Sequence, residues 1–314
     1  MYYYREIFKQ AAKIAFKHPV VWFFGLLAAL LGTSGEAEVF FSSYANSGWF
    51  NFWRSLSASG LLSGDGIRGL GTLFLQSPAL VVMVILAGLV VLALVVFVTW
   101  LVVISQTAVI AQSIAITRKH PLTWSESFAL GVNKFWPILG LNVILKVIVW
   151  LTISIIGVVA LQRFPLSAYV FVLVFNVGMI LVLISSLISR YAICAVILKD
   201  KSIKESFELA WRLFRNNWLM TIEISIILFL IIWLVSTVIS ILGFFAFFYI
   251  FRLYNGWLFG LVLLSLVLFT VFIILQIALT VFIWATWAII FEIISSKKNL
   301  LTSRLLSGWQ ALRR

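Results

Sequence analysis

Few residues of this sequence can carry chemistry. It contains one cysteine, Cys194, two histidines and ten acids among 314 residues. A single cysteine excludes a disulfide within the sequence and is expected to be a small buried side chain. The histidines, His18 and His120, lie beside prolines and the acids are scattered, so no converging metal ligands or acid–base groups are expected. We therefore expect no enzyme activity, no metal and no cofactor.

Charged residues are also scarce. Only 11% of the residues are charged and 63% are hydrophobic, whereas charged residues make up about a quarter of a soluble domain. No segment outside the apolar runs has the length and pattern needed for a separate soluble core. The composition therefore predicts an all-α integral membrane protein, with a single membrane domain over residues 1–314.

Six apolar runs predict transmembrane helices, each bounded by charges or turn-forming residues. The first has only fourteen residues and resembles a signal-peptide core, but it lacks a clear cleavage site, so we expect it to be retained. The second and the last would form helices about 58 to 60 Å long, twice the hydrocarbon thickness, and must tilt, kink or project beyond the headgroups. The runs cover residues 19–32, 79–117, 136–161, 166–198, 218–250 and 257–296.

Polar residues gather toward one end of the run 79–117, at Ser105, Gln106, Gln112 and Ser113. A polar side chain is costly in hydrocarbon, so these residues are expected to lie against protein beyond the headgroups. The run should therefore continue past the membrane and pack there.

The loops differ in charge. Four segments hold seventeen lysines and arginines against five acids, whereas the opposite side holds four arginines against three acids. The positive-inside rule places both termini in the cytoplasm, and we expect a bacterial cytoplasmic membrane. The net charge of +13 is then an orientation signal and an attraction for anionic headgroups, and no nucleic-acid-binding motif is present. The basic segments are residues 1–18, 118–135, 199–216 and 297–314.

A charged insert in the apolar sequence occurs more than once. SIKESFELAWRLFR, residues 202–215, alternates apolar and charged faces at helical spacing, and Ser202 with Glu205 forms a capping box. LTWSESFALGVNKFW repeats this design 79 residues earlier, with Thr123 and Glu126 as the box. The predicted apolar faces are Ile203, Phe207, Ala210, Trp211 and Phe214 in the later helix, and Trp124, Phe128, Val132 and Phe135 in the earlier one.

A third amphipathic helix is expected at the start of the sequence, with Ile7, Phe8, Ala11, Ile14 and Ala15 on its apolar side. Each amphipathic helix precedes a pair of apolar runs, so the chain is expected to consist of three hairpin repeats of parallel orientation, each preceded by a cytoplasmic amphipathic helix. The repeats cover residues 1–118, with an outer loop at 33–78, then 119–199 and 200–296, and a final amphipathic helix covers 297–314.

The segments SFALGVNKFWPILGLNVIL and SFELAWRLFRNNWLMTIEISIIL carry a family resemblance. They resemble the membrane domain attached to some bacterial glycerophosphodiester phosphodiesterases and to related multi-pass proteins. The resemblance implies a membrane module near lipid metabolism or the envelope. In those enzymes the catalytic residues belong to a separate soluble domain with metal-binding acids and histidines, so no catalytic residue is carried over.

Ionisable residues inside apolar runs are candidate site residues, because a charge in hydrocarbon costs about 2.5–3.5 kcal/mol even on the lenient scale. They are Lys146, Arg190, Glu223 and Glu292. Helix geometry places Arg190 and Glu223 at similar depths toward the cytoplasmic side, with Asn142 at a similar level in the preceding repeat. This polar layer is either the wall of a substrate or headgroup cavity or a structural ion pair that fixes helix register.

The amphipathic helices also carry basic faces, which either bind anionic lipid at the cytoplasmic side or only orient the chain. We therefore expect a non-enzymatic membrane protein that binds or organises envelope lipids, with lipid transport as a stronger version. The alternative is a transporter or channel with a path between the repeats. The basic residues are Lys9, Lys13, Lys17, Lys204, Arg212 and Arg215.

Overall fold

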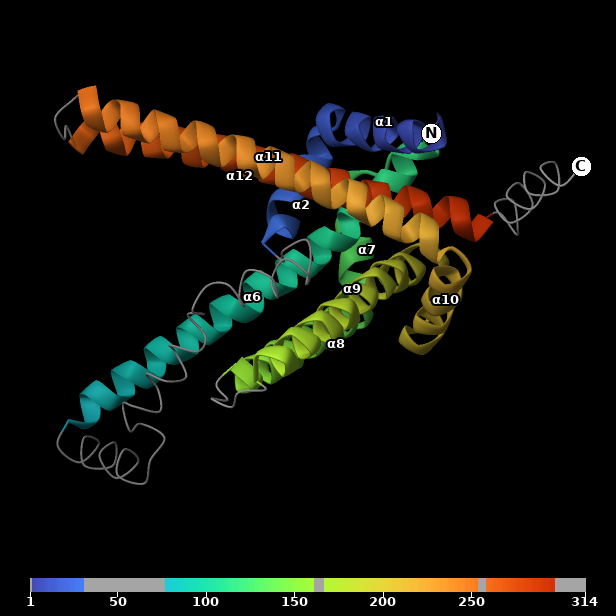
Figure 1. The fold of residues 1–314 in the computed structure, drawn as a ribbon, viewed down its shortest axis with the longest axis horizontal. Helices are drawn as coiled ribbons and strands as arrows, with labels where there is room; N and C mark the ends of the chain where they lie inside the picture. Colours follow the sequence, from blue (N-terminus) through green and yellow to red (C-terminus); the bar gives the residue numbers. More distant parts are fainter. Residues whose placement is uncertain (1, 31–76, 161–166, 254–257, 297–314) are drawn as a thin grey trace, which may run out of the picture. The chain divides into compact units, whose positions relative to one another are not determined.

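The computed structural model describes residues 2–30, 77–160, 167–253 and 258–296. All regular structure in these ranges is α-helical, as the composition predicts (Figure 1). Most of the predicted outer loop and the whole of the predicted C-terminal helix lie outside the described residues. The helices are α1 (Tyr2–Lys17), α2 (Pro19–Ala29), α6 (Pro78–Thr117), α7 (Trp124–Asn133), α8 (Phe135–Ala160), α9 (Ser167–Lys199), α10 (Ile203–Asn216), α11 (Trp218–Leu253) and α12 (Leu258–Ser296).

Five of the described helices, α6, α8, α9, α11 and α12, are long and apolar enough to cross a membrane. The first predicted span forms α2, whose 11 residues reach only about 16 Å, half of the hydrocarbon thickness. α2 is bent by 99° from α1, and this pair adds a sixth span only if the two helices are counted together. The chain therefore has the features of a multi-pass membrane protein with five to six spans.

The chain packs as two compact units. The first contains residues 1–33, 102–141 and 187–314, and the second contains residues 34–101 and 142–186. The divisions fall inside α6, α8 and α9, so each of these helices continues from one unit into the other.

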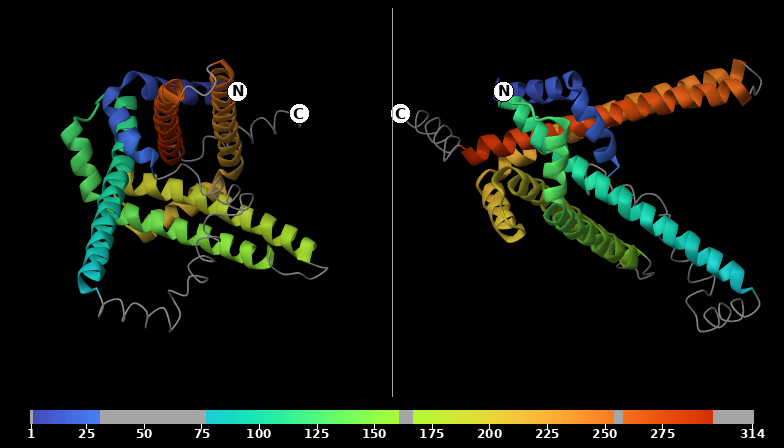
Figure 2. Two further views of the ribbon diagram at one scale, coloured as in Figure 1. Left: turned by 90° about the vertical axis from the view of Figure 1, so that its left-hand side faces the viewer. Right: turned by 180° about the vertical axis from the view of Figure 1, so that it is seen from behind.

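Helix α12 is central to the first unit. Every residue from 283 to 291 is buried, so this stretch contacts neighbours on all of its faces. α1, α2 and α11 pack on α12, and Phe8 of α1 lies 6.0 Å from Phe282, ring centre to ring centre. α11 and α12 run side by side as an antiparallel pair (Figure 2). The buried face of α1 consists of Ile7, Ala11, Ile14 and Ala15, four of the five residues of its predicted apolar face.

Helix α7 approaches α6 closely at Gly131. A methyl group at this position would lie 2.6 Å from Ile104 Cγ2 and 2.8 Å from the Ile104 carbonyl oxygen. Unstrained contacts between carbon atoms are about 3.5–4.0 Å. The carbonyl is part of the α6 backbone and cannot move without bending the helix. Gly131 therefore sets the distance between α7 and α6.

In the second unit, α8 and α9 form a pair around Val149, Ile156 and Val182, all of which are buried. Gly178 of α9 lies against Thr152 of α8, where an added methyl would meet the Thr152 Cγ2 atom at 2.7 Å. Small residues let the two backbones approach, which is how helices associate when lipid is as apolar as their side chains.

We expect Gly131→Ala to lower the free energy of unfolding by about 1–3 kcal/mol, because the methyl overpacks the contact with Ile104. Gly88→Ala is the matched control, since a methyl at Gly88 has nothing within 4 Å. Thermal unfolding of both variants in one detergent measures the difference. Equal melting temperatures would contradict the close packing of α7 on α6.

Candidate functional site

Arg190 is the residue of the predicted polar layer that the structure buries. It is 8% exposed, and its guanidinium carbon lies 5.1 Å from the centre of the Trp287 ring on α12. The negative face of an indole ring attracts a cation at this distance. Helix α9 thus places Arg190 against an aromatic surface of α12.

Tyr191 extends this contact to a third helix. Its ring lies edge-on to Trp287 at 5.6 Å and is 6.4 Å from Phe291. Its hydroxyl shares a 2.8 Å hydrogen bond with the hydroxyl of Thr221 on α11. Arg190, Tyr191, Thr221, Trp287 and Phe291, here called the aromatic–arginine cluster, connect α9, α11 and α12 within the first unit.

Glu223, the predicted partner of Arg190, lies two residues beyond Thr221 on α11 and is exposed. Tyr191 follows Arg190 directly, and its hydrogen bond to Thr221 brings this part of α9 close to the part of α11 that carries Glu223. The direct pairing of Arg190 with Glu223 stays a prediction.

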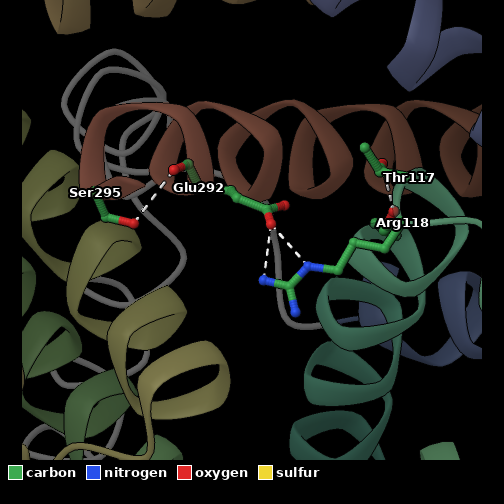
Figure 3. A network of polar contacts seen from close by, with 5 residues as sticks. Thr117, Arg118, Glu292 and Ser295 are labelled. Atoms are coloured by element: carbon green, nitrogen blue, oxygen red, sulfur yellow. Dashed lines mark hydrogen bonds and ion pairs between the residues drawn. The ribbon is translucent and has the colours of Figure 1, made fainter. Parts of the chain in front are cut away.

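Glu292 has a partner that the sequence did not suggest. Arg118, after the end of α6, donates from Nε to Glu292 Oε1 over 2.8 Å, and its Nη2 lies 2.7 Å from the same oxygen (Figure 3). The Arg118 side chain is 61% exposed, and such solvated pairs contribute little stability. The importance of this pair is positional, because it joins the C-terminal ends of α6 and α12.

The C-terminal end of α9 lies close to the C-terminal end of α12 as well. Lys199, its last residue, lies 5.8 Å from the centre of the Phe291 ring on α12. Three helices thus end close together in the first unit, with Arg118 and Lys199 near the negative ends of their helix dipoles.

Asn142 and Lys146 lie on the part of α8 that belongs to the second unit, where both are half-buried. Their neighbour Leu145 packs against the core around Val149 and Val182. A polar layer that these two residues share with Arg190 stays a prediction.

The buried ends of α6, α9 and α12 share a short pattern that the sequence reasoning missed. Each contains a polar residue, a hydroxyl-bearing or aromatic residue and an alanine, and all nine residues are buried. A helix buried on every face shows no amphipathic periodicity, so only a direct comparison of the three runs would have pointed to Tyr191 and Trp287. The pattern consists of Gln106–Thr107–Ala108, Arg190–Tyr191–Ala192 and Thr286–Trp287–Ala288.

The buried polar side chains of α6 form hydrogen bonds with protein atoms. Gln112 donates to the Leu122 carbonyl over 3.0 Å and accepts from the Ser127 hydroxyl over 3.2 Å. Thr107 and Ser113 donate to carbonyl oxygens one turn earlier in α6. As predicted, this end of the long apolar run packs against protein.

Helix α7 begins with the predicted capping box. Thr123 Oγ1 accepts from the Glu126 N–H over 3.3 Å, and Glu126 Oε2 accepts from the Thr123 N–H over 2.7 Å. The hydrogen bond from the Thr123 backbone, followed by that of its side chain, holds the pKa of Glu126 below its usual value. At α10, Ser202 accepts from the Glu205 N–H over 3.4 Å, whereas the Glu205 carboxylate pairs with Lys201 at 3.3 Å.

Helix α7 packs on α6 through small residues that are not part of its predicted apolar face. Ser127 and Gly131 are the buried residues of α7, whereas Trp124 is 49% and Val132 40% exposed. Trp124 stacks on Phe128 and on Phe24 of α2. The sequence predicted the apolar face but not the residues that contact α6, and the short distance to α6 admits only small side chains there.

Helix α10 divides its predicted apolar face. Ala210 and Phe214 are buried, whereas Ile203 and Trp211 are 38% and 50% exposed. The residues predicted to contact anionic lipid are all exposed, on α1 at Lys9, Lys13 and Lys17 and on α10 at Lys204, Arg212 and Arg215.

No family model matches the chain, and no curated protein or solved structure is significantly similar to it. The resemblance to phosphodiesterase membrane domains therefore stays an expectation. Within the described ranges, no three histidine, cysteine or acidic residues are grouped as a metal site requires. Cys194 is buried, as predicted.

We expect Arg190→Glu to destabilise the protein by about 3–5 kcal/mol, because it leaves an uncompensated charge in a buried position. Glu223→Arg should cost less, since Glu223 is exposed. If the two residues pair, the double swap melts above Arg190→Glu alone. Melting temperatures of the three variants in lipid nanodiscs measure this, and a double swap no more stable than Arg190→Glu would contradict the pairing.

Proposed function

We propose that this chain is a non-enzymatic multi-pass membrane protein that binds and organises anionic lipids at the cytoplasmic side of a bacterial membrane. The observation that carries the proposal is the division of its long helices into an exposed apolar part and a buried part that contains polar residues. Basic amphipathic helices accompany the buried part.

Helix α6 shows this division most clearly. Residues 82–97 are exposed on every face, whereas residues 102–114 are buried. The exposed stretch is about 24 Å long, close to the thickness of the hydrocarbon. The buried stretch contains Gln106 and Gln112 and requires protein contacts. Lipid therefore surrounds the first stretch, and the second lies at or beyond the headgroups.

The orientation follows from the helix ends. Arg118 bonds to Glu292 and Lys199 lies on Phe291, so α6, α9 and α12 end on one side. C-terminal ends on one side support three hairpins of parallel orientation. Arg118 and Lys199 at these ends support a cytoplasmic location, with both termini on that side.

Lipid organisation accounts for the exposed bases of α1 and α10, which lie beside this region. A base near an anionic membrane surface contributes about 1 kcal/mol of attraction. The transporter alternative gains less support, because Gln112, Thr107 and Ser113 direct hydrogen bonds to protein atoms.

The orientation is tested by labelling. A cysteine at Arg252, in the last turn of α11, should react with an impermeant maleimide in intact cells, whereas one at Lys201 should react only after permeabilisation. Both positions are exposed, and the buried native Cys194 provides an unreactive background. Reaction of the cysteine at Lys201 in intact cells would contradict the proposed orientation.

Lipid binding is tested by co-purification. The wild-type protein, extracted with its surrounding lipids, should be enriched in anionic lipid relative to the bulk membrane. Glutamine at the six predicted lipid contacts, which are three bases on α1 and three on α10, should reduce this enrichment several-fold, whereas Arg252→Gln should not. Wild-type protein without enrichment would refute the proposal. Labelling at Lys201 verifies that the variant keeps its topology.

A further inference from the structure

Helix α10 presents an exposed stripe in which an aromatic residue lies between two bases. Trp211 is half exposed, and Lys204 and Arg215 are exposed. Lys204 lies seven residues before Trp211 and Arg215 four residues after it. At about 100° per residue, the three side chains project within roughly 40° of one another. We call Lys204, Trp211 and Arg215 the α10 stripe.

The orientation of this stripe is set by the buried face of the helix, whose centre lies about 120° around the helix axis from the stripe. Ser206, Ala210 and Phe214 are buried, and α10 packs on α11. The stripe therefore faces away from the protein. Trp218 and Leu219, the first residues of α11, are also exposed, at 52% and 57%.

The charge around the stripe is positive. Glu205 is paired with Lys201, which leaves Glu208 as the nearest acid against Lys204, Arg212 and Arg215. Helix α7 has the same place in the preceding predicted repeat, yet residues 124–133 contain one acid and no base. The bases of α10 are therefore not needed to build such a helix.

We propose that the α10 stripe is a docking site for anionic phospholipid in the cytoplasmic leaflet, an assignment that rests on the proposed lipid-binding function. An indole ring is suited to the headgroup boundary, because it is apolar with one polar N–H. Lys204 and Arg215 bind the phosphates on either side, and Arg215 can engage two oxygens at once. The exposed start of α11 carries the acyl chains into the hydrocarbon.

The test uses the full chain in vesicles of one part phosphatidylglycerol to three parts phosphatidylethanolamine. After extraction in mild detergent, the retained phospholipids are quantified by class. Lys204→Gln/Arg215→Gln should lower the ratio of retained phosphatidylglycerol to phosphatidylethanolamine at least twofold. Trp211→Ala should lower the total retained lipid, and Trp211→Phe should retain most of it.

Two control variants distinguish lipid binding at the α10 stripe from an effect of the protein's net charge. Arg252→Gln removes an exposed base from the last turn of α11 and should match the wild type. Lys204→Arg preserves both the charge and the guanidinium of Arg215, so it should also match the wild type. Melting temperatures of the Lys204 and Arg215 variants should be unchanged, since both side chains are exposed.

The outcomes are distinct. If the wild type is enriched in phosphatidylglycerol and the glutamine variant keeps the same ratio, the stripe is not the site, although the proposed function stands. A loss in Arg252→Gln equal to that in the glutamine variant would also overturn the site, because the effect would then be one of net charge. Absence of enrichment in the wild type refutes the proposed function itself.

Discussion

The thickness of the hydrocarbon layer is the constraint on which the rest of this structure depends. About 20 helical residues cross it, whereas α6 has 40 residues and α12 has 39. The turns that exceed this length must be surrounded by something other than lipid. In the first unit they are surrounded by protein, because the ends of α6, α9 and α12 are buried together. Polar residues are tolerated in these ends because Gln112 bonds to Ser127 of α7 and Tyr191 bonds to Thr221 of α11. The apolar remainder of α6 needs only lipid.

The spans could be predicted from the sequence because a bilayer demands long apolar runs, and five predicted runs match helices α6, α8, α9, α11 and α12. Helix α2 shows where this reasoning weakens. Its run is apolar but short, and the 99° bend from α1 falls at His18, whose backbone is extended before Pro19. The capping box of α7 was predictable for a different reason, since its two bonds join residues three positions apart.

The candidate site was less accessible to prediction. The free-energy cost of a charge in hydrocarbon makes Arg190 and Glu292 stand out in the sequence, but it does not predict which residues they contact. Glu292 meets Arg118, which looked like an ordinary loop residue, because the ends of two remote helices meet. Hydrophobicity predicted the apolar face of α7, but it did not show that Gly131 would contact α6, because backbone distance decides that contact. Long-range geometry of this kind leaves little trace in local periodicity.

The packing of α1 on α12 has a consequence for how the protein is made. Phe8 and Phe282 are in contact although they lie near opposite ends of the sequence. The ribosome synthesises α1 before α12. Ile7, Ala11 and Ile14 therefore leave the ribosome well before α12, which covers them, has been made. Until α12 has been inserted, the membrane surface is the natural shelter for that apolar face. Completion of the first unit therefore waits for α12, and a chain that stops before α12 lacks the surface on which α1 packs.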